Sequence, residues 1–295
     1  MLKKRMLAKF YRCLPGTREL CRIMDSLERI HAELSLHRTF ETIRFFDLEL
    51  LHLPRYSDPR RLQRYASQIN SQNGEDGIIH EILRRVGSTN RLFAEVGVGD
   101  GSENNTAFLL SQGWNGFWID GSDAFVKTVN KRQDLQDGCL KWLVSFVGKE
   151  NISELFEQLG VPEEFDLLSL DIDQNTYYAW EGLQGYRPRV VVLEYNAAIP
   201  ADVNWKVRYE PHRTWDGSQN FGASLKAFEE LGRQLEYSLV GCNFIGANAF
   251  FVRNDLLSDK FAAPFTAENH YEPPRYELIH RRGHRRAILD RTNAG

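Results

Sequence analysis

The chain has 295 residues, of which 42% are hydrophobic, 12% aromatic and 26% charged. These are globular values that allow a sizeable core and exclude a disordered chain. No apolar run approaches the roughly 20 residues that span a bilayer, and the N-terminus lacks the uninterrupted apolar centre of a secretory signal. We therefore expect a cytoplasmic protein. The cysteines show no metal-ligand spacing and are expected to be free thiols: Cys13, Cys21, Cys139 and Cys242.

The net charge of −3 is unevenly distributed along the chain. Residues 1–66 carry 14 Lys and Arg against 8 Asp and Glu, which gives +6, so the remaining residues carry −9. The segment from Leu2 to Arg12 has the pattern of a basic amphipathic helix, which could lie peripherally on the anionic inner surface of a membrane. The alternatives are that it packs on its own domain or on a second subunit of a homo-oligomer.

Three regions follow from the pattern of apolar residues. Residues 1–65 form a helical N-terminal extension, in which the breakers "LPGT" and "LPRYSDP" leave room for two or three helices. Residues 66–258 alternate between strands and helices, which is typical of an α/β domain. Residues 259–295 form a basic C-terminal tail.

The α/β region predicts a Rossmann-like sheet of seven strands, mostly parallel. Only "FIGA" separates the last two strands, so they are expected to form an antiparallel hairpin. The predicted strands lie within 91–98, 116–121, 141–147, 165–173, 189–196, 236–243 and 248–253. The predicted helices lie at 75–86, within 99–113, and at 124–134, 152–159, 176–183 and 223–231.

A glycine-rich loop follows the first strand and precedes a helix. The motif "FAEVGVGDGSENNT" has the spacing Glu-x-Gly-x-Gly-x-Gly, which differs from the Gly-x-Gly-x-x-Gly of dinucleotide binders and favours another nucleoside ligand. Asp120 ends the second strand, where it could accept hydrogen bonds from both ribose hydroxyls or cap the next helix. Glu95 could contact the ligand or orient the loop.

These motifs resemble the class I S-adenosylmethionine-dependent methyltransferases, in "FAEVGVGDG", in the acid of "WIDG" and in seven strands ending in a hairpin. More narrowly, "SQNGEDGIIHEIL" and "GDGSENNTAFLLSQGWNGFWID" resemble the FkbM-type methyltransferases and their relatives, many of which methylate hydroxyls of sugars or natural products. The similarity covers residues 67–255.

The resemblance implies a site for S-adenosylmethionine. Its ribose would contact Asp120, and its adenine would contact Phe146, which could equally be a core residue. Asp171 would be the acid that contacts the methyl donor. The methionine part would lie against the loop residues Glu95, Gly97, Gly99 and Gly101.

Two carboxylates, Asp171 and Asp173, end a core strand, and the next strand ends in Glu194 and Asn196. Ligands of parallel sheets bind outside the carboxyl ends of the strands, so these four side chains are expected at one crevice. They are hard oxygen ligands that could hold Mg²⁺, which would lower the pKa of a bound hydroxyl. Without metal, one acid would act as a base and Asn196 would orient the substrate.

A general base is needed to methylate a neutral hydroxyl. The candidates are Asp173, Glu194 and His212, although a single histidine in a loop is more often structural. Trp205, Tyr209 and Trp215 lie near His212 in the sequence and could stack on a sugar or cover the sheet edge. The basic tail lacks the interleaved aromatic residues of single-strand grooves, so no nucleic-acid partner is expected.

Taken together, the patterns predict an O-methyltransferase for a hydroxyl of a saccharide or saccharide-linked small molecule, as in polysaccharide biosynthesis. A sugar oxidoreductase or epimerase would need the absent Gly-x-Gly-x-x-Gly and a Tyr-x-x-x-Lys pair. A non-enzymatic alternative is an inactive methyltransferase-like scaffold in a membrane-associated glycan-assembly complex. Fold alone does not decide between them.

Overall fold

The computed structural model describes residues 18–45, 49, 52–131, 138–211 and 213–276. It contains two compact units, a small one with helix α2 and a large one that begins at Leu53. The basic segment Leu2 to Arg12, most of the C-terminal tail and His212 lie outside the described residues. Within the described part of the chain, no helix combines the length and apolar character needed to cross a membrane.

Helix α2, Arg18–Arg44, is a single helix of 27 residues. The sequence predicted two or three helices across residues 1–65, of which residues 1–17 lie outside the described part. Neither Pro nor Gly occurs between Gly16 and Pro54, so nothing interrupts the helix before its end. The short helix α3, Pro54–Ser57, begins at the second predicted breaker.

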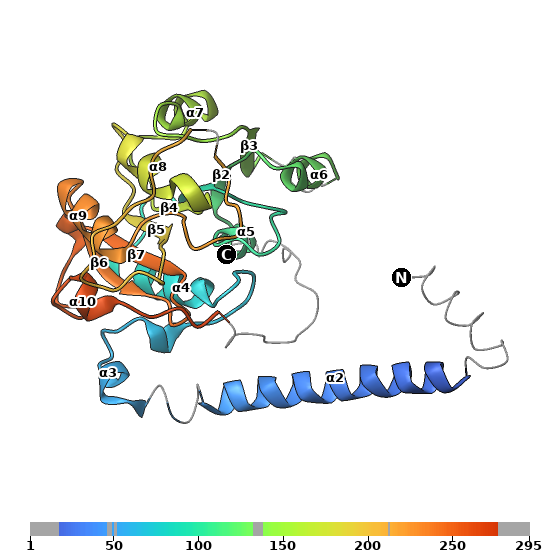
Figure 1. Ribbon diagram of the computed structural model, residues 1–295. Coiled ribbons are helices and arrows are strands. Elements are labelled where there is room, and N and C mark those ends of the chain that lie inside the picture. The colour runs from blue at the N-terminus through green and yellow to red at the C-terminus, as the bar shows by residue number, and fades with distance from the viewer. Residues whose placement is uncertain (1–17, 46–48, 50–51, 132–137, 212, 277–295) are drawn as a thin grey trace. The chain divides into compact units, whose positions relative to one another are not determined.

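The large unit contains one seven-stranded sheet with the strand order β3-β2-β1-β4-β5-β7-β6 (Figure 1). Strands β1 to β5 pair in parallel, and β7 pairs antiparallel with both β5 and β6. This confirms the predicted sheet and its C-terminal hairpin. The strands are β1 Leu92–Val96, β2 Asn115–Asp120, β3 Leu140–Val144, β4 Leu167–Leu170, β5 Val190–Glu194, β6 Tyr237–Cys242 and β7 Asn248–Arg253.

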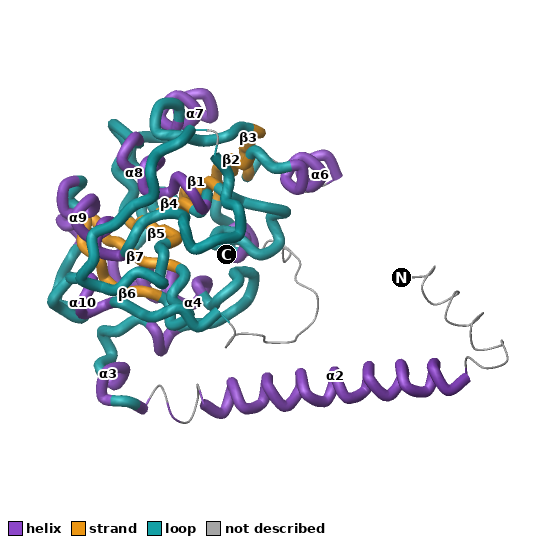
Figure 2. The backbone as a smooth tube through the Cα atoms, viewed as in Figure 1, coloured by secondary structure: helices purple, strands orange, loops and turns teal. Residues whose placement is uncertain are grey.

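Helices cover both faces of the sheet, which makes three layers (Figure 2). One face packs against α4 Glu75–Val86, α5 Ala107–Ser111 and α6 Asp123–Lys131. The other packs against α7 Ile152–Leu159, α8 Thr176–Gly182 and α9 Leu225–Gln234. The remaining elements are helix α10, Ala267–His270, and the 3-10 turns η3 Gln63–Tyr65, η5 Asp173–Asn175 and η6 Asn254–Leu256.

The central strands are apolar on both sides because both faces are covered. In β5, Val191 and Leu193 enter one core cluster, whereas Val190 and Val192 enter the other. This alternation follows from the two-residue period of a strand. The polar side chains are consequently left to the ends of the strands, where the crevice forms.

The α/β unit extends beyond the expected 66–258 at both ends. Gln63 donates its amide to the carbonyl of Cys242 at 3.1 Å and to the carboxylate of Glu272 at 3.2 Å. The hydroxyl of Tyr56 also donates to Glu272, at 2.9 Å. A fully buried carboxylate needs such donors, so Glu272 ties both flanking segments to the sheet.

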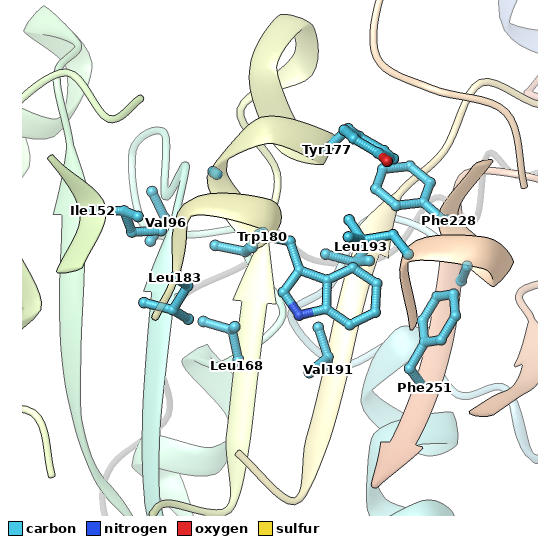
Figure 3. Close-up of a cluster of buried hydrophobic side chains, with 14 of the residues drawn as sticks. Val96, Ile152, Leu168, Tyr177, Trp180, Leu183, Val191, Leu193, Phe228 and Phe251 are labelled. Atoms are coloured by element: carbon cyan, nitrogen blue, oxygen red, sulfur yellow. The ribbon is translucent and has the colours of Figure 1, made fainter. Parts of the chain in front are cut away.

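Trp180 of α8 lies at the centre of one core cluster (Figure 3). Its ring centroid lies 5.0 Å from that of Phe251 on β7 and 5.8 Å from that of Tyr237 on β6. The side chain is only 2% exposed. It therefore joins the helical layer to the antiparallel end of the sheet.

We expect Trp180→Ala to lower the free energy of unfolding by about 3–5 kcal/mol, because it leaves a large cavity in a packed core. The control is Trp142→Ala on β3, where the side chain is 39% exposed and the loss should be below about 1 kcal/mol. Urea unfolding followed by far-ultraviolet circular dichroism measures both. Equal losses would contradict the central role of Trp180.

Candidate functional site

A polar crevice lies at the carboxyl ends of the parallel strands, where β1 and β4 mark the reversal of strand order. It has two compartments of about 350 and 740 Å³. The smaller extends over the ends of β2 and β3, and the larger extends toward β5 and β7. Both are lined by Gly97, Asp120, Ser122, Asp171, Asp173 and Trp215.

The glycine loop passes very close to the end of β4. Gly97 has φ +86°, and a Cβ there would lie 1.6 Å from the carbonyl oxygen of Asp171. Only glycine permits this approach. Gly99 also has positive φ, +62°, but a Cβ there would meet no atom within 4 Å.

Glu95 orients the loop rather than facing the crevice freely. Its side chain is 1% exposed and accepts hydrogen bonds from the backbone N–H groups of Asn105, at 2.8 Å, and Thr106, at 3.2 Å. The amide of Asn104 and the hydroxyl of Thr106 also donate to it. Burial raises the pKa of Glu95, and these donors act in the opposite direction. This geometry favours the second of the two roles that the sequence left open.

Asp120, at the end of β2, accepts hydrogen bonds from two neighbouring segments of the chain. One carboxylate oxygen accepts from the N–H groups of Val98 and Gly99, both at 2.7 Å, and the other accepts from Ser122 at 2.6 Å. The residue therefore supports the glycine loop and the start of α6. It also lines both compartments, so contact with a ribose stays a prediction.

Phe146 is not a core residue, because its side chain is 66% exposed. Its ring packs over Gly121, where a Cβ would lie 3.1 Å from the ring atoms, and it lines the smaller compartment. Asn151 holds this loop by donating to the carbonyl of Phe146 at 2.9 Å and accepting from Gly148 at 2.8 Å. An exposed aromatic ring is thus held at the crevice, where a planar ligand could stack.

The three predicted carboxylates meet at the crevice. Asp171, Asp173 and Glu194 each offer an oxygen within 4.8 Å of the others. Strand β4 ends at Leu170, and Asp173 has φ +51° in the turn η5. The turn, rather than strand alternation, therefore brings the two aspartates together.

The buried carboxyl groups of Asp171 and Glu194 lie close to each other, and the pKa of each depends on the other. Burial, with Asp173 nearby, raises the pKa of Asp171 to about 7. Burial raises the pKa of Glu194 well above its ordinary value, and the charges of Asp171 and Asp173 add to this. Both carboxyl groups therefore hold a proton more readily than an exposed acid does.

Asn196 does not join the carboxylates, which corrects its assignment as a metal ligand. Its buried amide donates to the carbonyls of Gln219, at 2.8 Å, and Phe221, at 3.0 Å, and accepts from Ala198 at 3.1 Å. The side chain therefore holds the loop after β5. Among the described His, Cys, Asp and Glu side chains, the three carboxylates form the one candidate cation cluster.

Of the three aromatic residues near His212, Trp215 lines the crevice. Tyr209 instead packs against Tyr178, with ring centroids 4.7 Å apart, and its hydroxyl donates to Glu150. Trp205 lines neither compartment. Of these three predicted stacking residues, only Trp215 is therefore placed to contact a ligand in the crevice.

Sequence reasoning missed several side chains at the larger compartment, among them Glu75 and Asn248. Glu75 begins α4 in the "SQNGED" motif, and Asn248 begins β7. Because β7 runs antiparallel to β5, its first residue lies at the same edge as the carboxyl ends of the parallel strands. The antiparallel hairpin that the sequence predicted already implied this position for the first residue of β7.

No family model matches the chain, and no curated protein matches it. Among solved structures it resembles the methyltransferase domain of bacterial CtHen1, with 14% identity over 61% of this chain and 97% of that chain and a TM-score of 0.34. The glycopeptide N-methyltransferase MtfA matches at 12% identity over 69% and 100%, with a TM-score of 0.37. An O-methyltransferase family protein from Burkholderia thailandensis matches at 12% over 61% and 58%, with a TM-score of 0.36. Similarity at this level does not establish a function.

We expect Gly97→Ala to destabilise the protein more than Gly99→Ala. Both substitutions place alanine in the left-handed region, at about 1 kcal/mol each, but only the first forces a methyl group onto Asp171. The overlap should add about 1–3 kcal/mol. Urea unfolding of the two variants gives the difference directly, and equal stabilities would show that the loop does not need this approach.

The raised pKa of Asp171 makes stability depend on pH. Its folded value of about 7 lies above the value of about 4 in an unfolded chain, so the folded state binds the extra proton. Stability should therefore fall as pH rises from about 4 to about 7. Asp171→Asn should reduce the loss of unfolding free energy between about pH 5 and about pH 8 by roughly 1 kcal/mol or more.

Chemical unfolding of the two proteins at both pH values measures this difference. The buried His270, whose pKa is lowered to about 3 by burial, is present in both proteins and cancels in the comparison. An unchanged pH dependence in the variant would show that Asp171 does not titrate with the raised pKa.

Proposed function

We propose that this protein is an S-adenosylmethionine-dependent methyltransferase that methylates a hydroxyl of a saccharide or saccharide-linked small molecule. The observation that carries the proposal is the two-compartment crevice. An acid and an exposed aromatic ring line its smaller compartment, and a cluster of carboxylates lies where that compartment joins the larger one. Such an arrangement suits a nucleoside beside a polar acceptor.

The smaller compartment would hold the adenosine part of the cofactor. Phe146 would stack on the adenine, and Asp120 would accept from the ribose while it keeps the loop in place. The methionine part would lie against Gly97 and Gly99 in the larger compartment. The bound cofactor supplies a methyl group on a positively charged sulfur.

Asp173 is the residue placed to accept the proton. It lines both compartments, and its carboxylate is partly buried, which raises its pKa. In the transfer, the acceptor oxygen forms a bond to the methyl carbon while the carbon–sulfur bond breaks, and the hydroxyl proton passes to Asp173. The other product is a neutral thioether, so atoms and charge balance.

The carboxyl pair leads us to a mechanism without a metal ion. Burial raises the pKa values of Asp171 and Glu194, and the amide of Asn196 is hydrogen-bonded within its own loop. A divalent cation would need ionised carboxylates, against the effect of burial, and would have to find its remaining ligands elsewhere, since Mg²⁺ prefers six oxygens. The carboxylates can instead orient the acceptor directly.

The "SQNGED" segment, which carries the narrower FkbM-like resemblance, has a defined local structure. Asp76 accepts from three successive backbone N–H groups, those of Ile69, Asn70 and Ser71, at 2.7 to 2.9 Å. This fixes the segment before α4 so that Gln72 and Glu75 reach the larger compartment. A saccharide acceptor, as in polysaccharide biosynthesis, fits a compartment lined mainly by polar groups.

We expect the purified chain to bind S-adenosylhomocysteine in calorimetric titration. Phe146→Ala should weaken binding through the loss of about 1–3 kcal/mol of stacking, or about 5- to 150-fold in Kd. Trp142→Ala, an exposed ring on the same strand region that does not line the crevice, is the matched control and should bind normally.

Absence of binding by the wild-type chain would overturn the cofactor assignment. Binding without turnover against any acceptor would instead favour the scaffold function.

With an acceptor in hand, Asp173→Asn should lower kcat by about 10²- to 10⁴-fold, because the proton acceptor is lost. Asparagine tolerates the left-handed backbone at this position, so the turn should persist. Binding of S-adenosylhomocysteine should change little. Asp216→Asn, on the exposed loop, is the control, and a normal kcat in Asp173→Asn would assign the base to another group.

A further inference from the structure

The far end of the larger compartment is rich in hydrogen-bond acceptors. Beyond Asp171 it is formed by Glu194 at the end of β5, Asn248 at the start of β7 and Glu75 at the start of α4. We refer to these three residues as the acceptor end. Its chemistry bears on the substrate of the proposed methyl transfer.

Asn248 presents an unpaired carbonyl oxygen. Its side chain is 6% exposed, and its amide nitrogen donates to the carboxylate of Glu75 at 2.8 Å. The amide of Asn243 donates to the same carboxylate oxygen at 2.7 Å, and its own carbonyl accepts from the backbone N–H of Asn248 at 3.0 Å. If the amide of Asn248 were flipped, its oxygen would face the carboxylate of Glu75, which is unfavourable because both groups are acceptors. The nitrogen therefore faces Glu75, and the oxygen Oδ1 has no hydrogen-bond donor.

Two further side-chain oxygens in the compartment also lack a hydrogen-bond donor. Oε2 of Glu194 has no hydrogen-bond partner. The same holds for Oδ1 of Asn104, whose side chain is 8% exposed and whose amide nitrogen is fixed by Glu95. Buried acceptors without donors are costly. A ligand that brings donors would relieve that cost.

The charges that line the compartment restrict the chemical class of the ligand further. Eight carboxyl groups line it, and none of the described lining residues is Lys, Arg or His. An ammonium group offers three donors and no acceptor, together with a positive charge. A carboxylated or phosphorylated acceptor would meet like charge instead, and a plain hydroxyl would bring no charge.

We propose, on the basis of the methyltransferase function above, that the acceptor is an amino sugar. Its protonated amine binds at the acceptor end, contacting Asn248 and Glu194. Glu75 is a positioning residue that orients the amide of Asn248. The bound ammonium has no free electron pair, so the methyl group goes to a neighbouring hydroxyl.

The test compares matched sugars with the full-length chain and S-adenosylmethionine, by release of S-adenosylhomocysteine at neutral pH. The pairs are glucosamine and glucose, galactosamine and galactose, and mannosamine and mannose, with glucuronate as the anionic probe. For at least one pair, kcat/KM should be tenfold or more higher for the amino sugar. The product should carry its methyl group on oxygen.

Substitutions distinguish an effect on amino-sugar recognition from an effect on the stability of the protein. Asn248→Ala should raise KM for the preferred amino sugar by about tenfold while kcat changes little. Glu75→Gln should raise the same KM but leave that of the neutral partner sugar nearly unchanged, a split that a structural defect would not produce. Asn204→Ala is the control, because its exposed amide contacts only Glu230 among the described hydrogen bonds.

Several outcomes would overturn the amino-sugar assignment while leaving cofactor binding intact. These are preference for a neutral or anionic sugar, methylation on nitrogen, turnover of none of the amino sugars, or activity lost in EDTA and restored by Mg²⁺. The last would assign the carboxylates to a cation. Failure to bind S-adenosylhomocysteine, in contrast, would remove the proposed function itself.

Discussion

The contact between Gly97 and the carbonyl of Asp171 is the constraint on which the crevice depends. It joins the loop after β1 to the end of β4 at the position where the strand order reverses. With a side chain at residue 97 the loop would have to lift away from β4, and the two compartments would lose their common wall. Glu95 and Asp120 then hold the loop down from two sides by accepting its N–H groups.

The carboxylates of the crevice fall into two groups according to their partners. Glu95, Asp120 and Glu75 accept hydrogen bonds from several backbone or amide donors, so their charge is compensated within the fold. Burial raises the pKa of Glu95 as well as those of Asp171 and Glu194, but among the described contacts Asp171 and Glu194 have mainly each other. Acids of the first group build the site, whereas acids of the second remain available to a ligand. The same residue type thus has different roles because the donors are unequally distributed.

The sequence predicted the sheet well because its strands are buried on both faces and therefore stand out as apolar runs. Val190 to Leu193 and the helix from Glu75 to Val86 illustrate patterns that tertiary contacts did not alter. The roles of the polar side chains at the crevice were harder to predict from the sequence. Asn196 follows a strand, as a ligand would, but its amide is consumed by a loop whose path no local pattern encodes. Asn248 was missed because its role depends on a hydrogen bond to Glu75, 173 residues away in the chain.

An acidic crevice suits a reaction that begins with a cation and ends without one. In the proposed methyl transfer, the carboxylates would attract the positively charged sulfur of the donor, and the loss of that attraction when the neutral thioether forms would favour release of the product. Too much negative charge would hold the reactant more tightly than the transition state and slow the transfer. Burial raises the pKa values of Asp171 and Glu194 and so favours their neutral forms, which limits this effect. In the proposed function, this buried pair would allow the crevice to bind a cationic donor, and Asp173 would accept the proton.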